Sequence, residues 1–136
     1  LLNTIPSPNG IVLNRSEKVA LVAVTRTNAI WLVPMTELGG VTKVGIFAQL
    51  PGPGPDGLAM DEESNLCVAH PGMGVVWVYD RKSVPVYRLQ SCAGSMITNL
   101  AYGGEENRYL YMTDASTGSI LRAKMPVPGR KMFSHM

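Results

Sequence analysis

Apolar residues along this chain come in short runs, and clusters of glycine, proline, asparagine, aspartate and serine separate the runs. This pattern is typical of short β-strands joined by tight turns. It predicts eleven strands, at residues 10–14, 19–24, 29–34, 43–50, 57–61, 66–70, 75–80, 84–90, 98–102, 109–113 and 119–124. No segment of 12 or more residues has the apolar period of a helix, and residues 35–40 offer a helical turn at most.

The predicted strands repeat in groups of about 45 residues. The first two groups open with Pro-Asn-Gly and Pro-Asp-Gly, and the step from Asn9 to Asp56 is 47 residues. A more degenerate start at Thr98 follows Asp56 by 42 residues, and Trp31 and Trp77 follow Asn9 and Asp56 by 22 and 21 residues. Repeats of this length, built from short strands, indicate the blades of a β-propeller. The sequence therefore predicts an all-β fold with blades at about 8–50, 55–90 and 97–125.

The three predicted blades do not make a closed ring. Propellers close with about four to eight blades, and the 136 residues hold fewer than three complete ones. The third repeat lacks a fourth strand, because Pro126 and Pro128 cannot donate backbone hydrogen bonds. Residues 1–5 resemble a leftover strand, and such a strand can complete a blade at the other end of a ring. We therefore expect the chain to associate, either with the missing N-terminal half of the propeller or as a homodimer of three blades plus three.

Composition and charge exclude several classes of protein. The net charge is +2 and no run of lysine or arginine occurs, which argues against a nucleic-acid partner. No stretch approaches about 18 consecutive apolar residues, so no membrane span is predicted. Cys67 lies in a strand pattern and Cys92 in a loop pattern, and we predict no disulfide between them. We expect a soluble protein, with the cytoplasm favoured, although the sequence leaves the compartment open.

Several segments carry a family resemblance. They are the Pro-Asn-Gly and Pro-Asp-Gly strand starts, residues 65–70, 74–80, 98–104 and 109–114, and the tail from Val127 through Ser134 and His135. Together they resemble the SMP-30/gluconolactonase/luciferin-regenerating-enzyme-like propellers. The resemblance covers essentially the whole chain, but only the C-terminal half of the family's domain. It implies a partial six-bladed β-propeller, with about three of the blades present.

The resemblance also implies a metal site in the central channel. Members of this family hold a divalent cation there, commonly calcium. Its ligands include a glutamate of the first blade, an asparagine at the Asn-Gly strand start and an aspartate at the Pro-Asp-Gly strand start. The last two match Asn9 and Asp56, whereas the glutamate would lie upstream of Leu1. Hard cations such as Ca²⁺ bind oxygen ligands of these types. The resemblance gives Asp56 a second role as base or nucleophile, but both tripeptides also occur in ordinary turns.

Strand direction adds further candidates for contact with a substrate. If each inner strand starts near the metal, the second strand of the blade returns to that end, and the loop after it lies on the same rim. The candidates on these loops and at the third strand start are Asn28, His70, Thr98, Asn99 and Asp114. For Asn28, His70 and Asp114 the alternative is a purely structural role in a turn.

Together these features predict a metal-dependent hydrolase of the gluconolactonase type, which opens a lactone with activated water. The expected partner is a small lactone or ester. Two alternatives stay open: an ester or organophosphate hydrolase on the same scaffold, and a non-catalytic truncated propeller that serves as a binding module. Structural zinc, a nucleophilic serine elbow and a phosphate loop are not supported, because their sequence motifs do not occur.

Overall fold

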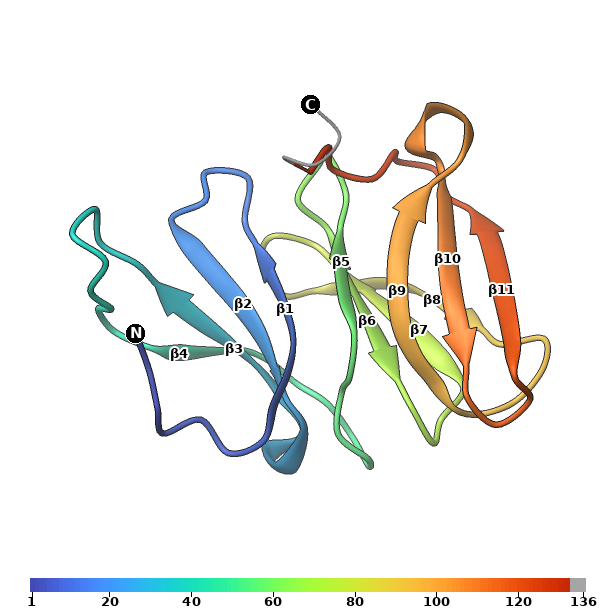
Figure 1. Ribbon diagram of the computed structural model, residues 1–136, viewed down its shortest axis with the longest axis horizontal. Helices are drawn as coiled ribbons and strands as arrows, with labels where there is room; N and C mark the ends of the chain where they lie inside the picture. Colours follow the sequence, from blue (N-terminus) through green and yellow to red (C-terminus); the bar gives the residue numbers. More distant parts are fainter. Residues whose placement is uncertain (133–136) are drawn as a thin grey trace.

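A computed structural model describes residues 1–132, which form three antiparallel sheets (Figure 1). Blade 1 contains β1 (Pro8–Leu13), β2 (Val19–Val24), β3 (Ala29–Pro34) and β4 (Gly45–Gln49). Blade 2 contains β5 (Leu58–Met60), β6 (Leu66–His70), β7 (Val75–Tyr79) and β8 (Pro85–Gln90). Blade 3 contains β9 (Ile97–Gly103), β10 (Tyr109–Asp114) and β11 (Ser119–Lys124). Consecutive strands pair within each sheet, as in propeller blades, so the predicted fold class is confirmed.

All eleven predicted strands form, and their ends differ from the prediction by no more than two residues. The helical turn considered for residues 35–40 is not present, because an isolated bridge between Met35 and Val41 closes this segment as a loop. Two short 3₁₀ helices occur elsewhere, η1 at Thr25–Thr27 and η2 at Glu105–Asn107.

The middle strands of blades 1 and 2 are buried on both faces. All five residues of β6 are buried, and so are five of the six residues of β2. Small and β-branched side chains suit this position, because they pack closely on a pleated surface. The outer strand β8, by contrast, is exposed at five of its six positions. The apolar runs of the sequence therefore mark the strands nearest the middle of each blade.

Apolar clusters hold the blades together. The cluster between blades 1 and 2 includes Leu21 and Leu66, and Trp77 packs against it. A second cluster joins β6 and β7 of blade 2 to β9 and β10 of blade 3. A third cluster lies on the other face of blade 1, where Trp31 and Ile5 pack. Trp77 therefore lies between blades 1 and 2, whereas Trp31 faces away from blade 2.

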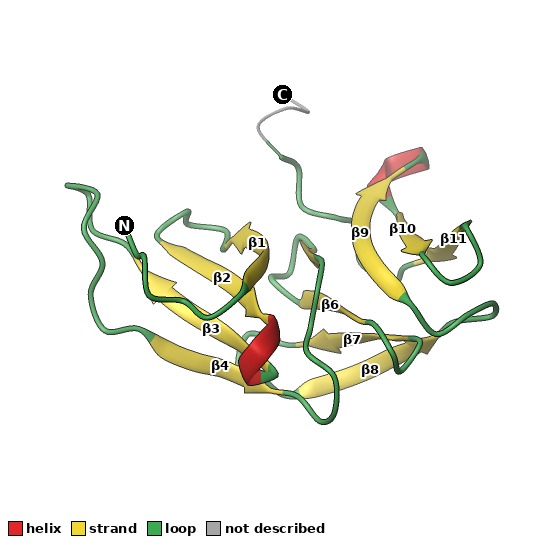
Figure 2. Ribbon diagram, turned by 60° about the horizontal axis from the view of Figure 1, so that its bottom comes forward, coloured by secondary structure: helices red, strands yellow, loops and turns green. Residues whose placement is uncertain are grey.

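The three inner strands β1, β5 and β9 start side by side. Figure 2 shows the blades arranged in an arc, with the outer strands β4 and β8 along its convex side. The amide of Gly10 donates to the carbonyl of Asp56 at 3.2 Å, and the amide of Gly57 donates to the carbonyl of Thr98 at 2.9 Å. A Cβ atom on Gly10 would lie 2.4 Å from the carbonyl oxygen of Asp56. The glycines after Asn9 and Asp56 are therefore needed for the close approach of the next inner strand.

Residues 126–130, which we call the C-terminal strap, cross the opposite ends of the inner strands (Figure 1, top). As the prolines predicted, the strap adds no fourth strand to blade 3. The amide of Gly129 donates to the carbonyl of Asn107 at 2.8 Å, and the amide of Arg130 donates to the carbonyl of Met60 at 2.9 Å. The strap thereby joins the far end of blade 3 to the far end of blade 2.

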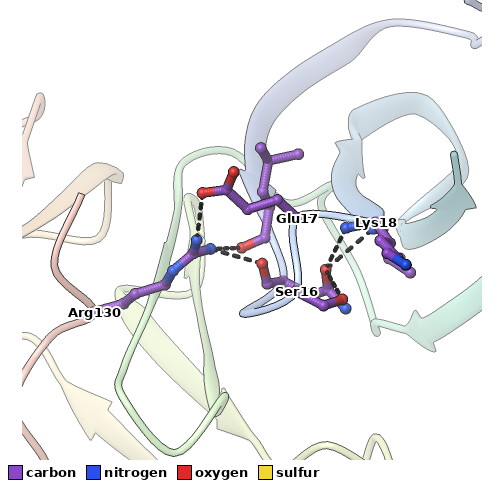
Figure 3. A network of polar contacts seen from close by, with 7 residues as sticks. Ser16, Glu17, Lys18 and Arg130 are labelled. Carbon is purple, nitrogen blue, oxygen red and sulfur yellow. Dashed lines mark hydrogen bonds and ion pairs between the residues drawn. The ribbon is translucent and has the colours of Figure 1, made fainter. Parts of the chain in front are cut away.

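Arg130 extends this connection to blade 1 (Figure 3). One guanidinium nitrogen, Nη1, donates to the carbonyl oxygens of Leu13 and Asn14, both at 2.7 Å. The other, Nη2, binds the carboxylate of Glu17 at 2.8 Å. A single side chain therefore fixes the β1–β2 turn to the C-terminal strap.

The prediction for the N-terminal residues is wrong. Residues 1–5 do not form the expected leftover strand. They form an irregular segment that is held by packing, since Ile5 contacts the third apolar cluster, and not by a strand ladder. Ser134 and His135, part of the expected family-like tail, lie outside the described residues. Within residues 1–132, no helix is long and apolar enough to cross a membrane.

Candidate functional site

The structure brings the two predicted metal ligands, Asn9 and Asp56, into contact where the inner strands start. Asn9 lies in β1 and is exposed, while Asp56 is half-buried two residues before β5. Burial raises the pKa of Asp56 above its usual value, and a hydrogen bond from the Asn9 side chain opposes part of this rise. An amide and a carboxylate from neighbouring blades therefore meet at one end of the channel.

The backbone on both sides of Asp56 is fixed by hydrogen bonds. Its amide donates to the carbonyl of Ala69 in β6 at 3.0 Å, and its carbonyl accepts from Gly10 of blade 1. The hydroxyl of Thr25 donates to the carbonyl of Pro55 at 2.9 Å. These contacts from two blades use only the backbone around Asp56, so its carboxylate is left to the contact with Asn9.

Thr98 and Asn99 occupy the equivalent start of β9. The Thr98 hydroxyl is 3.0 Å from that of Thr113 in β10. The Asn99 side chain is exposed, and its Oδ1 accepts a hydrogen bond from the amide of Leu100 at 2.9 Å. Both residues lie against Gly57, next to Asp56. The structure thus groups Asn9, Asp56, Thr98 and Asn99 at one end of the inner strands, and their roles stay a prediction.

Asn28 has a turn geometry. Its backbone is left-handed, with φ of 52° and ψ of 40°, directly after η1. Its carbonyl accepts from the amide of Leu50 at 2.7 Å and from the side chain of Gln49 at 2.9 Å. Asparagine tolerates this conformation better than most residues do. These contacts match the turn role that the sequence offered as the alternative.

His70 lies in the core, not on the rim where we expected it. The side chain is fully buried. Its Nδ1 accepts a hydrogen bond from the indole Nε1 of Trp77 at 2.9 Å, so the ring proton is on Nε2, which donates to the carbonyl of Pro53. Because both nitrogens are bound to the protein, this position does not support the expected contact with substrate.

Asp114 is also buried and has a full set of partners. Its carboxylate accepts hydrogen bonds from the hydroxyl and the amide of Ser116, at 2.7 and 3.0 Å, and from the amide of Gly94. The bond from the Ser116 hydroxyl is the main reason why its pKa is lowered to about 2. Asp114 therefore holds loops together, and the expected substrate contact is not supported here either.

A hollow of about 200 Å³ lies against the inner strands. Ile11, Leu58 and Tyr102 contribute to its wall, and Arg130 and Met132 line it next to the strap. Most of this wall is apolar, in contrast to the polar strand starts. Such a combination of an apolar wall with a few polar groups is typical of small-molecule sites.

The sequence model of the SMP-30/gluconolactonase/LRE-like region matches residues 1–116, most of the chain. The chain belongs to this family. Lactonase drp35 of Staphylococcus epidermidis is 34% identical over 91 residues, which cover 63% of this chain and 28% of that protein. The chain therefore spans less than a third of the length of this relative.

Solved structures support the same family fold. A luciferin-regenerating enzyme matches with a TM-score of 0.83 and 19% identity, over 94% of this chain and 48% of that one. Regucalcin of Agrobacterium tumefaciens, described as a calcium-binding protein, matches with a TM-score of 0.78 and 24% identity, over 90% of this chain and 47% of that one. The three blades described here correspond to about half of each structure.

The donor set of this SMP-30/gluconolactonase-like chain fits part of a hard-cation site. Asn9 and Asp56 offer an amide and a carboxylate oxygen, which are ligand types that Ca²⁺ prefers. Calcium takes about six to eight oxygen ligands, so these two residues supply a minority of them. Within residues 1–132, no group of three or more His, Cys, Asp or Glu residues could hold a metal ion. The remaining ligands would have to be water molecules or oxygen groups other than those of Asn9 and Asp56.

Arg130 is the residue near the channel that sequence reasoning missed. It lines the hollow and also fixes the strap to blade 1. The only local signal is a single arginine after Pro-Val-Pro-Gly. Its side-chain contacts lie 113 to 117 positions away in the chain, so no local pattern points to them.

Proposed function

We propose that this chain carries the metal-binding end of the channel of a divalent-metal-dependent lactonase, and that Ca²⁺ is the metal. The supporting observation is the contact between Asn9 and Asp56 at the inner strand starts, in a chain of this family. The relative called a lactonase and the calcium-binding neighbour agree with this proposal. The chain spans less than half of these proteins, so the activity belongs to the completed propeller.

In the proposed reaction the residues of this chain hold the metal, orient the substrate and move a proton. Asn9 and Asp56 would bind the metal through their side-chain oxygens. A divalent cation at such a site polarises an ester carbonyl and lowers the pKa of bound water. In this proposal Asp56 also accepts a proton as water attacks the carbonyl.

The products follow from the balance of bonds. Water adds to the carbonyl carbon, the ring C–O bond breaks, and the ring oxygen leaves as an alkoxide. The proton held by Asp56 passes to that oxygen, which yields an open hydroxy acid and restores the carboxylate. We propose that the exposed Asn99 and the neighbouring Thr98 contact hydroxyl groups of the substrate, which their position beside Asp56 supports.

Hydrolysis of a panel of substrates tests this proposal. The panel contains aldonolactones, a simple aryl ester and an organophosphate triester, each followed by proton release. We expect the lactones to be hydrolysed fastest, to lose activity with a chelator and to regain it with Ca²⁺. Faster turnover of the ester or the triester would contradict the lactone assignment, and full activity in chelator would contradict the metal. An assembled ring without any hydrolysis would instead indicate a binding module.

We also propose that further blades complete the ring around this site. Ile46 of blade 1 is 64% exposed and Ile120 of blade 3 is 76% exposed, so both terminal blades carry exposed apolar side chains. The first candidate is a longer polypeptide, in which residues 1–132 correspond to the C-terminal half. The second is a homodimer of three blades plus three, which would bring a second Asn9–Asp56 pair to the channel.

Light scattering on the isolated chain tests the assembly. A mass of two chains would support the homodimer, and a chain that is soluble only together with preceding blades would support the longer polypeptide. A compact monomer that unfolds cooperatively would contradict both forms of the proposal.

A further inference from the structure

The last residue of the second strand has the same place in each blade. Val24, His70 and Asp114 end β2, β6 and β10. Each pairs with the first residue of the third strand, namely Ala29, Val75 or Ser119. At this position the side chain is next to the segment that enters the inner strand of the same blade. Two of the three blades have a titratable, buried residue there.

In blade 2, His70 binds the segment that leads to Asp56. Residues 51–55 contain three prolines, which have no amide hydrogen, so this segment has few backbone donors with which to fix itself. The Nε2 hydrogen of His70 donates to the carbonyl of Pro53, three residues before Asp56. Trp77 fixes the histidine, because its indole can only donate and so leaves the proton on Nε2.

In blade 3, Asp114 makes the corresponding contact, but its side chain is the hydrogen-bond acceptor and the backbone is the donor. Its carboxylate accepts a hydrogen bond from the amide of Gly94, four residues before Thr98. A Cβ atom on Gly94 would lie 2.0 Å from the Ser116 hydroxyl and 2.6 Å from the Asp114 carboxylate. Only glycine therefore lets this segment approach the carboxylate. A donor faces a carbonyl in blade 2, and an acceptor faces an amide in blade 3.

We propose that His70 and Asp114 are positioning residues that fix the segments entering β5 and β9, and that His70, oriented by Trp77, in this way places Asp56 at the end of the channel. Both side chains are buried and bound to protein groups, so in this proposal neither contacts the substrate. The importance of Asp56 rests on the proposed function. The contacts of His70 with Pro53 and of Asp114 with Gly94, which we call the two clamps, do not depend on it. Blade 1 differs, since Val24 has no polar group and the neighbouring amide of Thr25 binds the carbonyl of Ser7 instead.

Amide hydrogen exchange and ¹⁵N NMR on the full chain test the proposal, with three variants. Trp77→Phe removes the donor to His70 and keeps an aromatic ring. Trp31→Phe is the matched control, because Trp31 has the corresponding place in β3 but no histidine partner. Asp114→Asn weakens the second clamp and keeps the size of the side chain.

We expect the wild-type ring of His70 to carry its proton on Nε2. Trp77→Phe should speed exchange at the amides of Gly54, Asp56 and Gly57 by roughly tenfold or more, and leave Gly94 and Thr98 unchanged. Asp114→Asn should speed exchange at the amides of Gly94 and Thr98 and leave those of the segment before β5 unchanged. Trp31→Phe should change neither segment. Unchanged amides in β6 and β10 would show that the variants are folded.

Several results would overturn the proposal. A proton on Nδ1 of His70 would do so, and so would equal exchange in all variants or a loss of protection spread over the whole chain. Hydrolysis separates this inference from the proposed function. If Asp56 acts as proposed, Trp77→Phe lowers kcat by roughly tenfold and changes KM little, since a small displacement of a reacting group is costly. The expected exchange pattern in a protein without lactonase activity would support the clamps and contradict the function.

Discussion

The two ends of the inner strands are built in different ways. At one end, the Asn9 side chain donates a hydrogen bond to the Asp56 carboxylate, and the backbone contacts that fix Asp56 do not involve this carboxylate. At the other end, the guanidinium of Arg130 binds two carbonyls and a carboxylate. The first end keeps polar groups for a ligand, whereas the second uses them for stability. We therefore expect changes at the first end to affect activity and changes at the second to affect folding.

The largest effect should come from Asp56. Asp56→Asn removes a ligand charge and the proposed base while keeping the size of the side chain. We expect kcat/KM for a lactone to fall by roughly 10² to 10⁴, with the midpoint of denaturant unfolding little changed. Asn28→Ala, in the turn of blade 1, is the comparison and should cost much less activity. Equal losses in the two variants would remove the special role of the Asn9–Asp56 contact.

Gly10→Ala should damage the same end through packing. The new Cβ atom would lie 2.4 Å from the carbonyl of Asp56 and 2.9 Å from the amide of Leu58, so the backbone has to move. We expect a loss of about 1–3 kcal/mol in the free energy of unfolding, together with reduced activity. Gly45→Ala is the control, because no atom lies within 4 Å of its Cβ position. If both variants behave alike, the close approach of β1 and β5 is not what requires the glycine.

Arg130→Ala should lower stability at the end of the inner strands that the C-terminal strap crosses. The variant leaves the carbonyls of Leu13 and Asn14 without their donor, which should cost about 1–3 kcal/mol of unfolding free energy. Glu17→Gln weakens only the ion pair between Arg130 and the exposed Glu17, so it should cost less than about 1 kcal/mol of unfolding free energy. Denaturant titrations of both variants measure this difference. Loss of activity in Arg130→Ala without loss of stability would mean that the second end also serves the ligand.

The smallest effect should appear in the pH dependence of Asp114. Its pKa is lowered from 3.8 to about 2 in the folded chain, so the ionised form is favoured by folding. The resulting stabilisation is present above about pH 4 and is lost as the pH falls towards 2. Asp114→Asn lacks this contribution, so the difference in thermal midpoint between wild type and variant should shrink between pH 4 and 2. A difference that stays constant over this range would show that the carboxylate charge does not stabilise the loop.

Sequence reasoning succeeded where the structure repeats. The strand pattern recurs in each blade, and Asn9 and Asp56 recur at the same step of the repeat, so period alone placed them at equivalent inner strand starts. His70 and Asp114 were assigned to the correct ends of their strands but to the wrong surroundings. Strand order fixes the rim on which a residue lies, but the direction of its side chain depends on partners such as Trp77 and Gly94.

The unrepeated parts could not be predicted. Residues 1–5 have strand-like composition, but packing of Ile5 on the outer face of blade 1 holds them without a ladder. Arg130 contacts residues more than 110 positions away, and no local pattern encodes such a distance. Short-range periodicity therefore predicts the blades, whereas the contacts that join the blades at their far end depend on tertiary structure.

A calcium titration followed by NMR tests the central claim most directly. The full chain, in the form in which it assembles, is titrated with Ca²⁺ up to about 10 mM, which exceeds the dissociation constants of weak calcium sites. We expect saturable shifts at Asn9, Gly10, Asp56 and Gly57, none at Arg130, and loss of all of them in Asp56→Asn. Absence of saturable shifts at the strand starts, or shifts centred on the C-terminal strap, would contradict the assignment of the ligand-binding end.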